Sequence, residues 1–187
     1  MNRFTLKEKA EYVGTLRTLD VSLMEMLARW VPSIPEMEVK VLLGRHLWDL
    51  AQHADLLGKR VFELRAPLHS GPPLSEPYGQ WLQGIAEMGS TQDRLAAFYE
   101  CLLPAISKRH EHYLGHTDRL QDEPTVRILE RIGQDQRRMQ QEHAALLREL
   151  PILAKNMPQW SKDLAASEDR LQLLRAEAVA VAAGKGE

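Results

Sequence analysis

Apolar residues recur three and four positions apart along most of this chain, the spacing that places them on one face of a helix. This pattern predicts a helix over residues 5–30, and the sequence VPSIP ends it. Ser33 and Glu36 have the spacing of a capping box, which would open a second helix that extends to about Val61. Because so short a link leaves little room to turn, we expect these two helices to be antiparallel neighbours.

The next segment, residues 65–90, interrupts the pattern with four prolines and four glycines. It predicts a long connection that holds one short helix, at about Tyr78–Met88. Ser90 is the predicted N-cap of a third long helix, in which Pro104 is expected to cause a kink. The sequence LQDEPT then turns the chain into a fourth helix, with Pro124 in its first turn.

The order of short link, long crossover and short link predicts an all-helical fold, an antiparallel four-helix bundle whose helices two and three are joined by the crossover. Residues 1–150 would form this bundle. Residues 151–187 would add an amphipathic helix, at about residues 161–182, and a tail. Such a helix would pack on the bundle or on a second subunit, so a homodimer is expected.

Composition narrows the class of protein. With 24 basic and 26 acidic residues the chain has no polyelectrolyte character, so nucleic acid is not an expected partner. The single cysteine, Cys101, excludes an intrachain disulfide and fits a reducing compartment. No signal-peptide or membrane-spanning run of apolar residues occurs in the sequence, and we therefore expect a cytoplasmic protein that does not enter a membrane.

Acids and histidines interrupt the apolar stripes at positions that would face the bundle interior. An unpartnered carboxylate there would be costly, so these residues need a cation, a proton or a hydrogen-bond partner. Each predicted helix offers one acid near its middle, and antiparallel packing would bring the four acids to a common level. The candidate metal ligands are Asp20, His46, Asp49, His53, Glu100 and Asp135.

At these residues the first 150 positions resemble the ferritin-like superfamily of non-haem di-metal carboxylate proteins. The segments GRHLWDLAQHADLL and DEPTVRILERIGQDQRRM are similar to the second and fourth helices of such proteins. The resemblance implies an iron or manganese centre. It also implies that Asp20 and Glu100 are the single acids of helices one and three, and that Asp49 with His53 and Asp135 with Arg138 hold the paired positions.

Two residues depart from the family's pattern. Leu50 stands where the usual acid of the second helix would be, and Arg138 stands in place of an imidazole. A guanidinium cannot ligate a metal, and its charge opposes a nearby divalent cation. Arg138 would instead form an ion pair with Asp135, three residues earlier. His46 would then be a substitute ligand, because it precedes Asp49 at the three-residue spacing.

The same polar residues have interpretations that need no metal. The buried acids would pair with arginine or tyrosine from a neighbouring helix, and the histidines would bond to a carboxylate or a carbonyl group. Of the histidines in KRHEHYLGH, only His112 and His116 share a face, and they fit a solvated helix end. Glu142 and His143 fit the polar border of the fourth helix.

Three functional hypotheses follow. In the first, an iron or manganese centre oxidises a small molecule with oxygen. In the second, ion pairs such as Asp135 with Arg138 have replaced the metal, and the chain is an accessory or assembly subunit that binds a protein partner. In the third, the chain is an unrelated helical bundle or a ligand-binding module.

Overall fold

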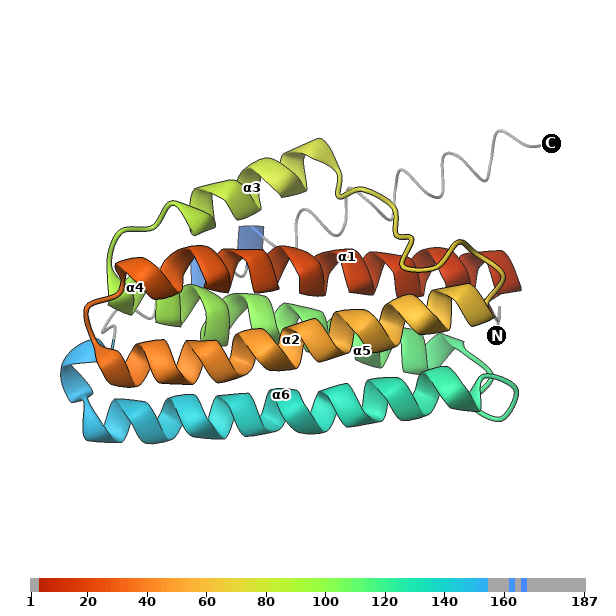
Figure 1. The fold of residues 1–187 in the computed structure, drawn as a ribbon. Helices are drawn as coiled ribbons and strands as arrows, with labels where there is room; N and C mark the ends of the chain where they lie inside the picture. Colours follow the sequence, from red (N-terminus) through yellow and green to blue (C-terminus); the bar gives the residue numbers. More distant parts are fainter. Residues whose placement is uncertain (1–3, 155–161, 164–165, 168–187) are drawn as a thin grey trace.

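Four long helical segments lie side by side, and shorter elements connect or cover them (Figure 1). This computed structural model describes residues 4–154, 162–163 and 166–167, and all regular structure in them is helical. The elements in chain order are α1 (Leu6–Trp30), η1 (Val31–Ser33), α2 (Met37–Glu63), α3 (Glu76–Ala86), α4 (Thr91–Ala96), the π-helical turn η2 (Ala97–Leu102), α5 (Leu103–His116), α6 (Glu123–Glu149) and η3 (Pro151–Leu153). The all-helical prediction is confirmed for the described residues.

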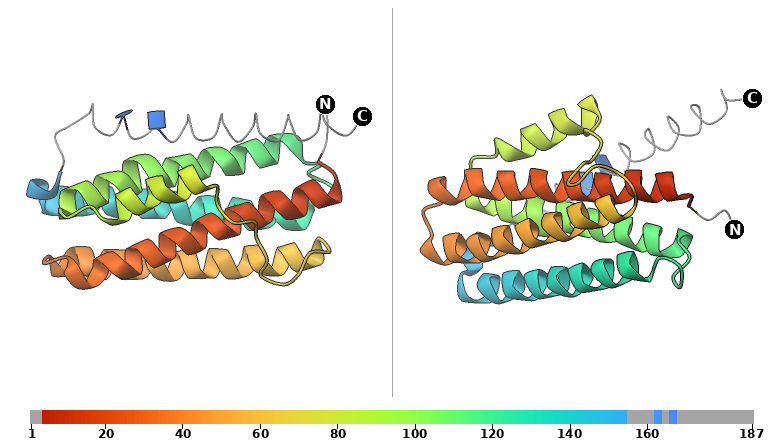
Figure 2. Two further views of the ribbon diagram at one scale, coloured as in Figure 1. Left: turned by 90° about the horizontal axis from the view of Figure 1, so that it is seen from above. Right: turned by 45° about the vertical axis from the view of Figure 1, so that its right-hand side comes forward.

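The long segments form a closed ring, since α1 packs on α2, α2 on α6, α6 on α5, and α5 on α1. Helices α1 and α6 run in one direction, and α2 and α5 run in the other (Figures 1 and 2). Every neighbouring pair in the ring is therefore antiparallel. The links from α1 to α2 and from α5 to α6 are short, whereas the chain between α2 and α4 crosses the outside of α1 and includes α3.

Two predicted helix starts have different outcomes. The hydroxyl of Ser90 accepts a hydrogen bond from the backbone N–H of Asp93, at 3.0 Å, and so caps α4 as predicted. The capping box at Ser33 and Glu36 is wrong, because Ser33 belongs to η1 and no side chain caps the start of α2. Glu36 instead accepts a hydrogen bond from the hydroxyl of Thr91, at 2.8 Å. This contact ties the start of α2 to the start of α4.

The crossover lies directly on α1 where two glycines meet. A Cβ atom on Gly71 would overlap the carbonyl oxygen of Gly14 and the hydroxyl of Thr18. The same hydroxyl lies 3.1 Å from the carbonyl oxygen of Pro72. The absence of both side chains lets the two backbones approach, and this contact holds the crossover against the bundle.

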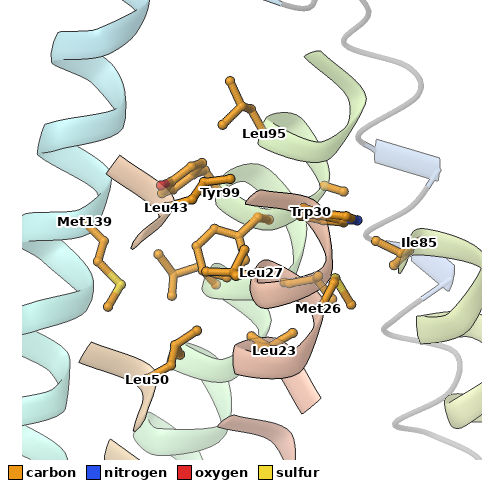
Figure 3. Packing of buried hydrophobic residues seen from close by; sticks show 14 of the residues in the cluster. Leu23, Met26, Leu27, Trp30, Leu43, Leu50, Ile85, Leu95, Tyr99 and Met139 are labelled. Carbon is orange, nitrogen blue, oxygen red and sulfur yellow. The ribbon is translucent and has the colours of Figure 1, made fainter. Parts of the chain in front are cut away.

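The apolar interior has two parts. The first core fills the end of the bundle near the α1–α2 link, and Figure 3 shows it. The second core fills the opposite end, near the start of α1. The first core includes Leu23, Met26, Leu27, Trp30, Leu43, Leu50, Ile106 and Met139. The second core includes Val13, Leu16, Leu57, Tyr113, Leu129 and Ile132. Burial of each such side chain contributes about 1.5–3 kcal/mol to folding.

The predicted C-terminal helix at about residues 161–182 lies, apart from residues 162–163 and 166–167, outside the described residues. The division of the chain at residue 150 therefore stays a prediction. In the described part of the chain, none of the helices combines the length and the apolar character needed to cross a membrane.

Candidate functional site

The third helical segment contains the π-helical turn η2, which changes its backbone hydrogen bonds. Leu103 donates its N–H to the carbonyl of Phe98, five residues back, so the carbonyl of Tyr99 loses its usual partner. Pro104 has no N–H to offer in its place. The side-chain amide of Gln140 on α6 donates to the Tyr99 carbonyl instead, at 2.6 Å. The predicted distortion at Pro104 is thus a π turn with a cross-helix hydrogen bond.

Tyr99 begins a buried hydrogen-bond chain that links three helical segments. Its hydroxyl lies 2.6 Å from Nδ1 of His46, whose Nε2 lies 3.0 Å from the carboxylate of Glu142. Because a carboxylate accepts, Nε2 carries the proton and donates, and Nδ1 accepts from the tyrosine hydroxyl. Burial lowers the pKa of His46, although Glu142 opposes this. The ring of His143 stacks on Tyr99, with centroids 4.0 Å apart.

The guanidinium of Arg138 occupies the space among the carboxylates of α2 and α6. One of its nitrogens donates to Asp49 at 3.0 Å and to Asp135 at 2.9 Å, and the other lies 3.7 Å from Glu142. Asp135 also accepts from Nε2 of His53, at 3.2 Å. Burial raises the pKa of Asp135, but the hydrogen bonds from Arg138 and His53 outweigh it and leave this pKa below its usual value. The ion pair predicted between Arg138 and Asp135 is confirmed.

A layer of polar side chains separates the two apolar cores. Each long helical segment contributes one buried polar residue between a residue of the first core and a residue of the second. The four residues, which we call the polar layer, are Asp20 of α1, His53 of α2, His110 of α5 and Gln136 of α6. Asp20 lies between Leu23 of the first core and Leu16 of the second, and His53 lies between Leu50 of the first and Leu57 of the second. In the same way His110 lies between Ile106 and Tyr113, and Gln136 lies between Met139 and Ile132.

Several buried atoms of the polar layer have no hydrogen-bond partner among the described residues. They are both carboxylate oxygens of Asp20, Nδ1 of His53, both ring nitrogens of His110 and the side-chain nitrogen of Gln136. Burial raises the pKa of Asp20 to about 8, so the acid is protonated at neutral pH. Burial also lowers the pKa of His110 to about 3, with help from nearby His53. At pH 7 the layer is therefore largely uncharged.

The structure distributes the six predicted ligands over three places. Asp20 and His53 belong to the polar layer, and Asp49, Asp135 and His46 are bonded to Arg138 or to Tyr99 and Glu142. Glu100 is exposed, whereas the residue before it, Tyr99, is buried. The four acids expected at one level do not form a common group.

These residues, as they lie, do not fit a di-metal centre. The carboxylates of Asp49 and Asp135 are shared with a guanidinium, whose positive charge opposes a cation at the same position. Within the described residues, no three His, Cys, Asp or Glu side chains are arranged to hold a metal ion together.

Sequence reasoning missed several residues of these clusters. The sequence predicts Glu142 and His143 on a polar border, yet Glu142 bonds His46 and His143 packs on Tyr99. His110 shares its face with no other histidine, but its place four residues after Ile106 on the apolar stripe is a signal of its burial. The expected solvated pair is exposed: the rings of His112 and His116 stack, with centroids 4.3 Å apart.

In comparisons with known proteins, no family model, no curated protein and no solved structure matches the chain.

Proposed function

We propose that this chain is a metal-free ferritin-like bundle that works by binding, as an accessory or assembly subunit, rather than by oxidising a substrate. The bundle part of the proposal is supported by the ring of antiparallel neighbours and by the long crossover, which joins helices α2 and α5 at diagonal corners of the ring.

The observation that carries the metal-free part is the position of Arg138. Its guanidinium lies on the seam between α2 and α6, and it bonds the carboxylates of Asp49 and Asp135, two of the acids that a di-metal centre would need, from within the chain. A carboxylate pair whose charge is already partly compensated by a guanidinium gains less from a divalent ion, which would have to displace Arg138 or be repelled by it.

Metal analysis tests this directly. The full chain, purified without chelator, incubated with excess Fe²⁺ or Mn²⁺ and then desalted, is expected to retain far less than one ion per chain. The measurement is elemental analysis by mass spectrometry against protein concentration. One or two ions per chain, lost in both Asp20→Ala and Asp49→Ala, would instead reject the metal-free proposal and favour an iron or manganese centre.

The partner in this proposal is a second copy of the chain, which would dock on the outward face of α2. Met37, Val41 and Trp48 are all more than half exposed there and share one stripe. Gly44 lies between Val41 and Trp48, and a Cβ atom on it would meet nothing within 4 Å. In an antiparallel pair of α2 helices crossing at Gly44, Val41 of each copy would face Trp48 of the other, as two-fold symmetry requires.

Sedimentation velocity over a range of concentrations tests this contact. We expect the parent chain to form a dimer, and Trp48→Glu to sediment as a monomer because a charge would be buried against Val41. Leu120→Glu is the matched control, since Leu120 is 87% exposed and lies in the α5–α6 turn, outside the stripe of Met37, Val41 and Trp48. A monomeric parent, or equal masses for the parent and Trp48→Glu, would reject this dimer.

A further inference from the structure

Two exposed histidines lie on adjacent turns at the C-terminal end of α5. His112 and His116 are four residues apart, so they share one face of the helix. Their rings stack at an interplanar angle of 28°, with centroids 4.3 Å apart. Two histidines at this spacing on a helix can bind one metal ion together, as they do in helical zinc sites.

Hydrogen bonds fix which ring nitrogen of each histidine carries the proton. The hydroxyl of Tyr12 lies 3.0 Å from the carbonyl oxygen of Arg109 and 3.1 Å from Nδ1 of His112. Since a carbonyl group only accepts, the hydroxyl donates to Arg109 and accepts from Nδ1 of His112. Nδ1 of His116 donates to the carbonyl oxygen of His112, at 2.8 Å. A neutral imidazole has one N–H, so Nε2 of both rings carries a lone pair.

Both Nδ1 contacts are of the kind that orients metal-binding histidines. Such a histidine usually donates the N–H of its other nitrogen to a carbonyl group or a similar acceptor, which fixes the ring and makes the ligating nitrogen more basic. With Nδ1 held against the protein, Nε2 lies at the end of each exposed side chain that is farthest from the backbone. An ion about 2.1 Å from each nitrogen can bridge two nitrogens up to about 4 Å apart, so small rotations of these rings suffice.

Electrostatics at this end of α5 favour a metal ion over a second proton. Burial and the neighbouring His116 lower the pKa of His112, so this ring is neutral at pH 7 and can act as a ligand. His116 is the last residue of α5, where the helix dipole places partial negative charge beside the two rings. A cation bound there is stabilised by the end of the helix.

We infer that His112 and His116 bind one late first-row transition-metal ion through Nε2 of each ring, with water in the remaining coordination positions. Imidazole suits copper, nickel and zinc, and among the divalent ions Cu²⁺ binds a given nitrogen site most tightly. This inference goes beyond the proposed function and does not depend on it. The proposed absence of metal concerns the bundle interior, whereas this pair lies on the surface of α5.

Calorimetric titration of the full chain with Cu²⁺ at pH 7, in a buffer that does not bind copper, tests the site. One Cu²⁺ ion per chain is expected to bind, and the electron paramagnetic resonance spectrum of the complex should show two imidazole nitrogens. Zn²⁺ and Mn²⁺ are both expected to bind more weakly than Cu²⁺.

Four variants separate the ligands from the contact that orients them. His112→Gln and His116→Gln should each weaken Cu²⁺ binding about tenfold or more, because no second imidazole captures an ion already held by the first. Tyr12→Phe keeps both ligands but removes the acceptor for Nδ1 of His112, and should weaken Cu²⁺ binding about tenfold. His69→Asn is the control: it removes the remaining histidine that is not buried among the described residues, and asparagine tolerates the φ of 54° there. It should leave the affinity unchanged.

Three results would overturn the inference: no saturable binding of Cu²⁺, parental affinity in either glutamine variant, or parental affinity in Tyr12→Phe. The last would mean that the pair is an ordinary exposed pair without an orienting contact. Both glutamine variants change exposed side chains, so the test holds even if Tyr12→Phe fails to fold. Copper lost in the glutamine variants is a separate result from iron or manganese lost in Asp20→Ala and Asp49→Ala, so the proposed function can stand or fall separately.

Discussion

Asp20→Asn is expected to raise the free energy of unfolding at pH 7 by about 2–4 kcal/mol. The Asp20 carboxyl is fully buried, lacks a partner among the described residues and has a pKa raised to about 8. Folding at pH 7 must therefore protonate a group that is ionised in the unfolded chain. Asparagine has the shape of the protonated acid and does not titrate, so the substitution removes this cost while it keeps the packing.

The sign of the pH dependence follows from the direction of the shift. Because the pKa of Asp20 is higher in the folded chain, its contribution to stability is fully present below its ordinary pKa, about 3.8, and is lost as the pH rises to about 8. Burial lowers the pKa of His110 to about 3 and that of His143 to about 4. Their contributions are present above about pH 6.5 and are lost as the pH falls. The parent chain should therefore be most stable near pH 6.5.

Urea unfolding at several pH values between 5 and 9 measures this effect. In Asp20→Asn the decline of stability between pH 6.5 and 8 should disappear. Glu38→Gln is the control, because it makes the same acid-to-amide change on the exposed side of α2 and should alter stability by less than about 0.5 kcal/mol at every pH. If Asp20→Asn behaves like Glu38→Gln, Asp20 is ionised in the folded protein and has a partner.

Much of the fold could be predicted, because the helices follow the spacing of apolar residues and the links between them are marked by proline and glycine. The burial of Asp20 and His53 followed from their places on apolar stripes, and the long crossover followed from residues 65–90. These features are local, since helical spacing fixes a residue's face once the helix is regular. They did not depend on how the four helices meet.

The third helical segment is where this reasoning failed. Five of the six residues of η2 are buried, and Glu100, which the sequence predicts inside, is the exposed one, so the apolar pattern there does not define a single inward face. On α6 the sequence does not show which of two adjacent residues faces the interior, because adjacent residues of a helix point in directions only 100° apart. Asp135 therefore faces the seam with α2 while Gln136 enters the polar layer, and only tertiary packing distinguishes them.

Asp122 supports a second buried network, at the end of the bundle near the α5–α6 turn. One carboxylate oxygen accepts hydrogen bonds from Thr125 at 2.6 Å and from Arg60 at 2.9 Å. The other accepts from Tyr113 and Thr117, both at 2.7 Å. Burial raises the pKa of Asp122, but these four donors outweigh it and hold the pKa below its usual value. The carboxylate thus joins α2, α5 and α6.

Asp122→Ala is expected to lower the free energy of unfolding by about 3–5 kcal/mol, because one guanidinium nitrogen of Arg60 and three hydroxyls lose the carboxylate that accepts their hydrogen bonds. Urea unfolding at pH 7 measures the loss. Asp118→Ala is the matched control: that carboxylate accepts hydrogen bonds from two turn N–H groups in the same loop, those of Leu120 and Gln121, and its loss should cost about 1 kcal/mol or less. Equal losses in the two variants would mean that the network contributes no more than an ordinary turn.

The pH dependence identifies the ionised carboxylate as the source of the effect. Because the pKa of Asp122 is lowered in the folded chain, its contribution to stability is lost as the pH falls through that pKa, so the larger loss in Asp122→Ala should vanish at pH 2–3.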